Sequence, residues 1–294
     1  MNNIEIQDLS KSFKNGAKAL NNINIQIQDG IFGLLGKNGA GKTTLMRILT
    51  TLLEPTSGTV KICGSELCKE NYEKIKRNIG YLPQELGLYP NMTVRESLDY
   101  MGGLNGLDKK TRDERISRLL ELTNLSSHQY KKNRQLSGGM KRRVGLVQAM
   151  LSYPKILIVD EPTAGLDPEE RIRIRSLLSD FGKDRTVILS THMIEDLAAT
   201  CNHICVLNQG ILKYDGTVSD MMQNVKDHVF CAILKSEKEL LTLQDNYPVT
   251  GKIYENEKIK VRFVCKAKPD MECDVIDANL EDAYIYINNM EISK

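Results

Sequence analysis

Apolar and polar residues follow two different rhythms along the chain. Five isoleucines alternate with polar neighbours in two early segments: Ile4, Ile6, Ile23, Ile25 and Ile27. This period of two predicts half-buried antiparallel strands. Segments 31–35 and 156–159 are instead apolar throughout, apart from one glycine. Such uninterrupted runs predict strands that are buried on both faces, as in a parallel sheet.

Helical spacing of apolar residues appears in two regions. Segment 42–53 carries such spacing, and the pattern of the region from about 85 to 145 is also helical. The clearest helix is 111–122, in which Thr111 and Glu114 have the spacing of a capping box. Strands and helices in this order predict an α/β fold.

The composition of the chain changes after about Asp220, where acidic residues begin to outnumber basic ones. Strands are expected at 228–234 and 258–264, and a helix at 237–244. We therefore expect a main domain over residues 1–218 and a small α+β accessory domain over residues 219–294.

Charge and cysteine content argue against several classes of protein. The formal net charge is +2 over 294 residues, so no strong field marks the chain for nucleic acid. No apolar run approaches the roughly 20 residues that span a bilayer. The seven cysteines are scattered without a Cys-x-x-Cys pair, which is typical of reduced thiols in the cytosol.

A glycine-rich sequence links the buried run at 31–35 to the helical segment at 42–53. Residues 36–43 read Gly-Lys-Asn-Gly-Ala-Gly-Lys-Thr. Glycines in this pattern let backbone N–H groups turn around a polyphosphate at a helix N-terminus. Lys42 would supply charge to the outer phosphates, and Thr43 a hydroxyl to Mg²⁺. The structural alternative is a glycine-rich turn at a helix start.

Two acids follow the second buried run. Asp160 and Glu161 come directly after 156–159, and ligands gather beyond the carboxyl ends of parallel strands. Asp160 is expected to hold Mg²⁺, and Glu161 to orient and deprotonate an attacking water. Without a phosphate loop, the same pair would indicate only a solvated strand end.

Further motifs occur in a fixed order along the chain. They are Gln84 in Tyr-Leu-Pro-Gln-Glu, the signature Leu136-Ser137-Gly138-Gly139, Asp167 after Ala-Gly-Leu, and His192 after Ser-Thr. Together with the phosphate loop and the two acids, this order resembles the ATP-binding subunit of an ATP-binding cassette (ABC) transporter over residues 3–220. The resemblance implies a phosphate-loop NTPase core, an antiparallel β subdomain and an inserted helical subdomain at about 85–145.

The resemblance also implies roles for single residues. Glu161, His192 and Gln84 are expected to act in catalysis, and Thr43, Gln84 and Asp160 to hold Mg²⁺. The expected nucleotide-binding residues are Phe13, Gly36, Asn38, Gly39, Gly41, Lys42, Thr43, Thr44, Ser137, Gly138, Gly139 and Asp167. Phe13 would stack on adenine. In the family, the signature faces the nucleotide of a second subunit in a head-to-tail dimer.

The implied function is ATP hydrolysis that powers transport through a separate transmembrane permease. The implied cofactors are ATP and Mg²⁺, and the implied partners are the permease and a second ATPase subunit, either a copy of this chain or a different one. No nucleic acid is expected. Segment 86–94 is expected to line the groove for the permease, on the cytoplasmic face of the cell membrane.

Export is the favoured direction, because the helical region and the tail resemble those of drug, bacteriocin and sodium exporters. The rival class is a cytosolic ABC ATPase without a transport role, such as an iron–sulfur-assembly type. The short stretch between Lys42 and Ser137 leaves no room for the long coiled coil of chromosome-structuring members.

Overall fold

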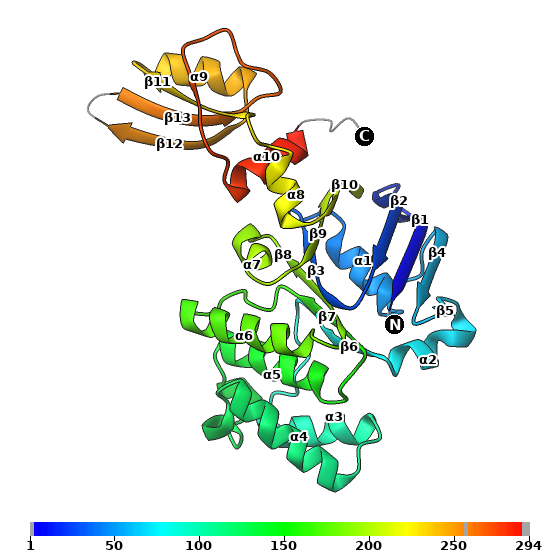
Figure 1. The fold of residues 1–294 in the computed structure, drawn as a ribbon. Coiled ribbons are helices and arrows are strands. Elements are labelled where there is room, and N and C mark those ends of the chain that lie inside the picture. Colours follow the sequence, from blue (N-terminus) through cyan, green and yellow to red (C-terminus); the bar gives the residue numbers. More distant parts are fainter. Residues whose placement is uncertain (1–2, 256–257, 290–294) are drawn as a thin grey trace. The chain divides into compact units, whose positions relative to one another are not determined.

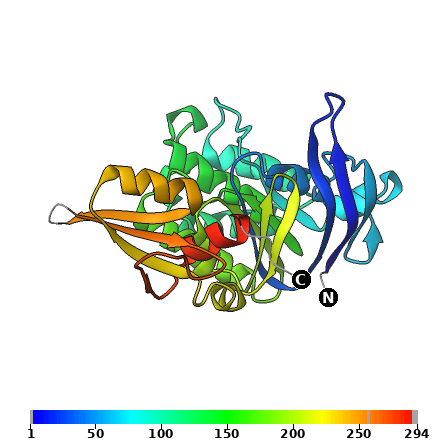
Figure 2. The ribbon, with the colours of Figure 1, turned by 90° about the horizontal axis from the view of Figure 1, so that it is seen from above.

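The computed structural model describes residues 3–255 and 258–289 of the chain. The chain divides into two compact units, Met1–Leu212 and Lys213–Lys294, whose elements are drawn in Figures 1 and 2. The division falls within the short strand β10 (Ile211–Gly216), a few residues before the boundary that the motifs suggest.

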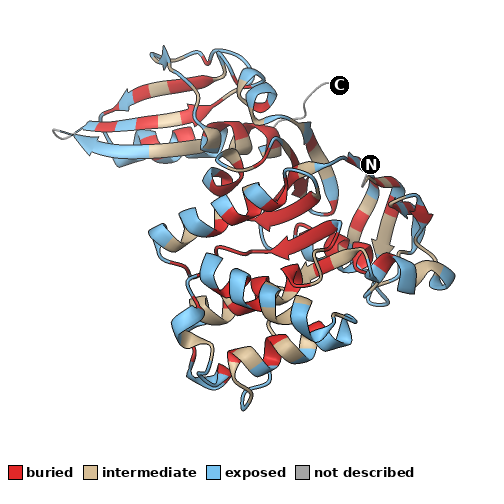
Figure 3. Cartoon of the chain, turned by 60° about the horizontal axis from the view of Figure 1, so that its bottom comes forward, coloured by how far each residue is buried: buried red, intermediate tan, exposed pale blue. Residues whose placement is uncertain are grey.

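A parallel sheet forms the centre of the first unit. The sheet has the order β10-β9-β3-β8-β7-β6, and the five strands from β9 to β6 pair in parallel. β7 and β8 are buried along their whole length (Figure 3), and the apolar run at 156–159 predicted this burial for β7. The strands are β3 (Gly30–Leu35), β6 (Ile79–Leu82), β7 (Ile156–Asp160), β8 (Thr186–Thr191) and β9 (His203–Asn208).

The second sheet of this unit is antiparallel, with the order β2-β1-β4-β5. Ile4 of β1 pairs with Ile27 on one side and with Ile62 on the other. All three side chains are at most 1% exposed, so the alternating isoleucines form a buried face, as their period predicts. The strands are β1 (Ile4–Ser12), β2 (Lys18–Ile27), β4 (Ser57–Ile62) and β5 (Ser65–Glu66).

Helix α1 (Lys42–Leu49) ends four residues earlier than the spacing at 42–53 predicts. Thr51 has a φ of 61°, and the N–H of Leu52 donates to the carbonyl oxygen of Arg47 at 2.8 Å. This is the Schellman arrangement that closes many helices, usually with glycine in the left-handed position. Because threonine takes that position here, residue type alone did not reveal the stop.

The helical region contains α3 (Val94–Leu104), α4 (Lys109–Leu122) and α5 (Gly138–Met150). The predicted cap of α4 was wrong. The side chain of Asp108 accepts the N–H of Thr111 at 3.0 Å, so the helix begins at Lys109 and Thr111 lies in its first turn. The remaining helices of this unit are α2 (Tyr72–Lys76), α6 (Pro168–Phe181), α7 (Ile194–Ala198) and the 3-10 turns Lys69–Asn71, Ser126–His128 and Asn133–Gln135.

The C-terminal unit contains a four-stranded antiparallel sheet with the order β12-β13-β11-β14. Phe230 and Phe263 are stacked and buried at its centre, beneath α9. The exposed strand β12 was not predicted, because an edge strand with polar residues lacks a clear alternation. The elements are α8 (Val218–Gln223), β11 (Val229–Leu234), α9 (Glu237–Asn246), β12 (Val249–Glu255), β13 (Lys258–Val264), β14 (Asp274–Val275) and α10 (Leu280–Asn289).

A buried ion pair fastens α10 to β13. Asp282 is fully buried, and Nε of Arg262 donates to its two carboxylate oxygens at 2.9 and 2.8 Å. Asp282 also accepts the N–H of Asn279 at 2.8 Å and donates its own N–H to Asn279 Oδ1 at 2.9 Å. One carboxylate therefore begins the helix and holds it to the sheet.

We predict that Asp282→Ala lowers the free energy of unfolding of the C-terminal unit by about 3 kcal/mol, because it leaves the Arg262 guanidinium without its partner. Urea denaturation of the full chain, followed by a probe in this unit, measures the change. Glu281→Ala, at an exposed position in the same turn, is the control and should change stability by less than about 0.5 kcal/mol. Equal stability of the two variants would contradict the anchoring role of the pair.

Candidate functional site

The phosphate loop connects β3 to α1 at the carboxyl edge of the parallel sheet (Figure 1). Gly39 and Gly41 have φ values of 81° and 107°, a conformation that favours glycine. A Cβ at Gly41 would also lie 2.6 Å from the carbonyl oxygen of Ala19. At Gly36 it would lie 2.5 Å from that of Leu207. Glycine is thus required here both by backbone conformation and by close packing.

The positively charged side chain of Lys42 is held at the loop by backbone carbonyl oxygens. Its side chain is buried, and its ammonium donates to the carbonyl oxygen of Gly36 and, at 3.2 Å, to that of Lys37. Burial lowers the pKa of Lys42 below its ordinary value, while the carboxylates of Asp160 and Glu161 oppose that decrease. The cation therefore stands between the loop and two acids.

Asp160 ends β7 level with Ser190 of β8. Its carboxylate accepts hydrogen bonds from the hydroxyl of Ser190 and, at 3.1 Å, from that of Thr43. Asp160 is 1% exposed, so these bonds replace the water that it loses on burial. The sequence predicted Thr43 and Asp160 but not Ser190. The available signal was the shared edge at which parallel strands end.

Glu161 lies next to Asp160 and points its carboxylate at His192. Oε1 of Glu161 and Nδ1 of His192 are 2.8 Å apart. The Glu161 side chain is 9% exposed and that of His192 is 57% exposed, so the pair spans from the protein interior to its surface. The N–H of Glu161 donates to the carbonyl oxygen of Ser190 at 3.1 Å. The end of β8 thus supports both acids.

Two hollows lie along this edge. One, of about 320 Å³, is lined by Gln84, Asp160, Glu161 and the phosphate loop. The other, of about 510 Å³, is lined by Gln84, Glu161, His192 and the signature glycines at 138–139. Asn38, Gln84 and Glu161 line both hollows. The loop residues that line the first hollow are Lys37, Asn38, Gly39, Ala40, Gly41, Lys42, Thr43 and Thr44.

Four predicted residues line neither hollow: the buried Gly36 at the start of the loop, and three residues with exposed side chains. Phe13 is 42% exposed, with the ammonium of Lys11 at 5.6 Å from its ring centroid. Ser137 caps α5 by accepting the N–H of Met140 at 3.2 Å. Asp167 precedes α6 and is exposed. Each side chain therefore remains accessible at the surface of the unit.

Two residues that the sequence did not single out also lie at this site. Arg142 of α5 lines the second hollow, although it is 7% exposed. Burial, reinforced by the carboxylate of Asp160, raises the pKa of Tyr81 to about 12. The phenol of Tyr81 therefore stays protonated at neutral pH. The sequence offered one signal for Arg142 as a residue of the site, namely its position in the helix that follows the signature.

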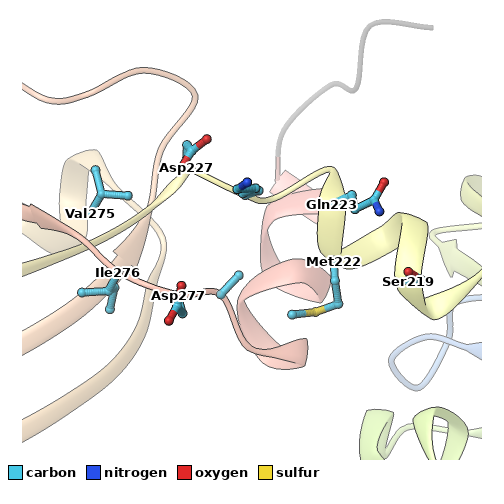
Figure 4. A pocket seen from close by; sticks show the side chains of 9 residues that line it. Ser219, Met222, Gln223, Asp227, Val275, Ile276 and Asp277 are labelled. Carbon is cyan, nitrogen blue, oxygen red and sulfur yellow. The ribbon is translucent and has the colours of Figure 1, made fainter.

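A separate hollow of about 700 Å³ lies in the C-terminal unit (Figure 4). Met222 and Lys226 line one part of it, and Val275, Ile276 and Asp277 another. None of the residues predicted to bind nucleotide or metal contributes to this hollow. All of those predicted residues belong to the first unit.

Comparison with known proteins decides the family. Residues 20–164 match the family described as ABC transporter. The chain is 35% identical over 254 residues to the uncharacterized ABC transporter ATP-binding protein YxlF of Bacillus subtilis (strain 168), covering 86% of this chain and 83% of the relative. This chain belongs to the ATP-binding subunits of ABC transporters.

Other relatives of the ABC family have named functions. The Nod factor export ATP-binding protein I of Cupriavidus metallidurans is 33% identical over 289 residues, which cover 93% of each chain. The methionine import ATP-binding protein MetN 2 of Oceanobacillus iheyensis is 34% identical and covers 83% of this chain and 76% of the relative. These relatives transport in both directions, and they favour a transporter subunit over an ATPase without a transport role.

Solved structures agree with this assignment. The ATP-binding subunit of an ABC transporter superposes with a TM-score of 0.70 at 29% identity, covering 75% of this chain and 92% of the other. A dimeric ATP-binding cassette in a post-hydrolysis state, bound to ADP and Pi, has a TM-score of 0.66 at 26% identity and covers 73% of this chain and 98% of the other. The fold is therefore the phosphate-loop NTPase fold of the family.

The chain is accordingly a nucleotide-binding, ATP-hydrolysing subunit of a transporter. ATP-binding subunits of this family work with membrane permeases. No helix within residues 3–255 and 258–289 is long and apolar enough to cross a bilayer.

We predict that Ser190→Ala destabilises the first unit by about 1 to 3 kcal/mol, because the buried Asp160 carboxylate loses a hydrogen-bond donor. Chemical denaturation without nucleotide measures the effect. Ser176→Ala is the matched control, since Ser176 is exposed and its hydroxyl donates within its own helix to the carbonyl oxygen of Ile172. A loss no larger than that of the control would mean that Ser190 does not support Asp160.

Proposed function

We propose that this chain hydrolyses ATP with the site at the carboxyl edge of its parallel sheet. The observation that carries the proposal is the meeting of the phosphate loop with two acids. Thr43 bonds to Asp160, and the next residue, Glu161, bonds to His192. Phosphate-binding and water-activating groups therefore line one continuous edge, which is what in-line attack on a terminal phosphate requires.

The phosphates would bind to the loop that begins at Gly36. Gly39 and Gly41 leave backbone N–H groups unobstructed at the N-terminus of α1, and Lys42 adds a full charge. Gly36, Asn38, Thr43 and Thr44 would complete this cradle. Phe13 would stack on adenine, and its partly exposed ring supports that role.

Thr43, Asp160 and Gln84 would hold Mg²⁺. Their side chains offer a hydroxyl, a carboxylate and an amide oxygen, which are the hard ligands that Mg²⁺ accepts. The distance of 3.1 Å between Thr43 Oγ1 and Asp160 Oδ2 brings two of these ligands together. The ion would neutralise charge on the outer phosphates of the substrate.

Glu161 would act as the general base. Its carboxylate would accept a proton from the water that attacks the γ-phosphate, while Gln84 orients that water. His192 would fix the carboxylate through their 2.8 Å contact and reach the γ-phosphate from its exposed position. Catalysis would then depend mainly on the placement of these three side chains.

We also propose that two copies of the chain form the working enzyme. Ser137, Gly138 and Gly139 begin α5, where N–H groups and the helix terminus attract an anion. Ser137 and Asp167 are exposed and lie outside both hollows of their own chain. They could therefore contact ATP bound to a second copy, as the dimeric form of a solved relative suggests. One chain carries every motif, which favours a homodimer.

The helical region would contact a separate permease at the cytoplasmic face of the membrane. Segment 86–94 follows Gln84 directly and contains Tyr89, which is 54% exposed. Export is the direction that we propose. Two Nod factor export ATP-binding proteins match over 93% to 98% of each chain, whereas three methionine import ATP-binding proteins are covered over only 69% to 76% of their length.

We predict that Glu161→Gln slows ATP turnover by about 100-fold or more, because it removes the proton acceptor but keeps the size of the side chain. ATP affinity should stay close to that of the wild type, and ATP-Mg²⁺ should trap a dimer. A phosphate-release assay, titration calorimetry and size-exclusion chromatography measure these three quantities.

The control adds Lys42→Ala to Glu161→Gln, because loss of the phosphate charge should abolish both nucleotide binding and the trapped dimer. A Glu161→Gln variant that turns over ATP at the wild-type rate would refute the role of Glu161 as general base. A monomer in saturating ATP-Mg²⁺ would refute the shared site.

We further predict that Ser137→Arg prevents dimer formation while each monomer still binds ATP. The long cation would occupy the space that the second copy's nucleotide needs, yet Ser137 lines neither hollow of its own chain. The variant is tested in the Glu161→Gln background by size-exclusion chromatography and by nucleotide titration. Undiminished dimerisation would remove the signature from the interface.

A further inference from the structure

Arg142 is the most deeply buried arginine at the site, and its guanidinium bonds to backbone rather than to acids. Nε donates to the carbonyl oxygen of Glu161 at 3.0 Å. Nη1 donates to the carbonyl oxygens of Pro83 and Gln84, at 2.8 and 2.7 Å. One side chain on α5 therefore joins the segment after β6 to the segment after β7.

The placement of Arg142 is costly for stability. Burial lowers its pKa, and the acids Asp160 and Glu161 only partly oppose that decrease. Its Nη2 is buried without a hydrogen-bond partner among the residues that the structure describes. An unsatisfied buried donor costs about 1 to 3 kcal/mol. An apolar side chain would avoid these costs, so a role beyond packing is indicated.

The backbone of Glu161 explains what the contact achieves. Glu161 has a φ of 53°, a left-handed conformation that a glutamate rarely adopts. Such strain persists only where neighbouring groups fix the backbone. The carbonyl oxygen of Ser190 accepts the N–H of Glu161. The carbonyl oxygen of Glu161 in turn accepts hydrogen bonds from Arg142 and from the N–H of Ala164. Arg142 is the only side chain among these three contacts.

The approach of α5 to β6 lets the guanidinium reach both segments. A Cβ at Gly145 would lie 2.5 Å from Leu86 and 2.8 Å from Leu82. A Cβ at Gly80 would overlap the carbonyl oxygen of Ala149. Helix and strand are therefore in direct contact, and a displacement of the Gln84 segment meets a rigid support.

We propose that Arg142 is a positioning residue that fixes the backbone of Gln84 and the strained backbone of Glu161 relative to each other. Through it, a movement of the Gln84 segment is transmitted to the carboxylate that activates water. This inference rests on the catalytic role proposed above for Glu161. In this role Arg142 acts through the backbone of Gln84 and Glu161, to which its guanidinium donates.

The test compares Arg142→Gln and Arg142→Lys in the full-length chain. Arg115→Gln is the matched control, because Arg115 Nη1 donates to the carbonyl oxygen of Leu151 at the other end of α5, at 3.1 Å. The measurements are kcat and KM for ATP, and amide hydrogen exchange of Glu161 and Ala164 without nucleotide. The exchange measurement does not depend on turnover.

Arg142→Gln should lower kcat by about 10- to 100-fold, because small displacements of a catalytic group have effects of this size. KM should change less than about threefold, since the phosphate loop is untouched. The Glu161 and Ala164 amides should exchange faster than in the wild type. Arg142→Lys, with three donors but no planar fork, should restore part of kcat and part of the protection.

Wild-type kcat with unchanged exchange in Arg142→Gln would overturn the proposal. So would equal losses in Arg142→Gln and Arg115→Gln, because that result would indicate a general loss of structure. If Glu161→Gln itself turned over ATP normally, the role proposed for Glu161 would fail. The exchange of the two amides would still decide whether Arg142 fixes this backbone.

Discussion

The alignment of β7 with β8 is the constraint on which the site depends. Parallel pairing brings the ends of both strands to one edge, so that Asp160 lies beside Ser190. β3 pairs with the other side of β8 and delivers the phosphate loop to the same edge. A shift of one residue between β7 and β8 would turn the Asp160 side chain to the other face of the sheet. Every residue of β7 and β8 is buried, and this burial keeps the register.

The motifs could be predicted from the sequence because their chemistry needs particular residue types at particular spacings. Few other residue types could supply the charge of Lys42 in the loop or the carboxylate of Glu161 at the strand end. Ser190 and Arg142 could not be found in this way. Their roles depend on which strand end or helix turn lies opposite, and only the packed chain determines that.

Element boundaries show the same division between local and tertiary information. The cap of helix α4 lies three residues before the predicted one, because the side chain of Asp108 accepts the N–H of Thr111. Helix α1 stops at Leu49 although Thr51 is not a usual residue for a left-handed position. In the C-terminal unit, β12 is an edge strand beside β13, and its exposed residues carry little periodic signal. Local pattern was thus sufficient for buried elements and insufficient for ends and edges.

The close packing of α5 against β6 limits which residues this sequence can carry at the contact. Gly80 and Gly145 have no functional group, yet neither position has room for a Cβ atom beside its neighbours. A methyl group at either position would push α5 away from β6. All the hydrogen bonds that the Arg142 guanidinium donates would then become longer. Catalytic activity should therefore depend on side-chain size at two positions that carry no functional group. A comparison of natural variants that considered only charged or hydroxylated residues would overlook both.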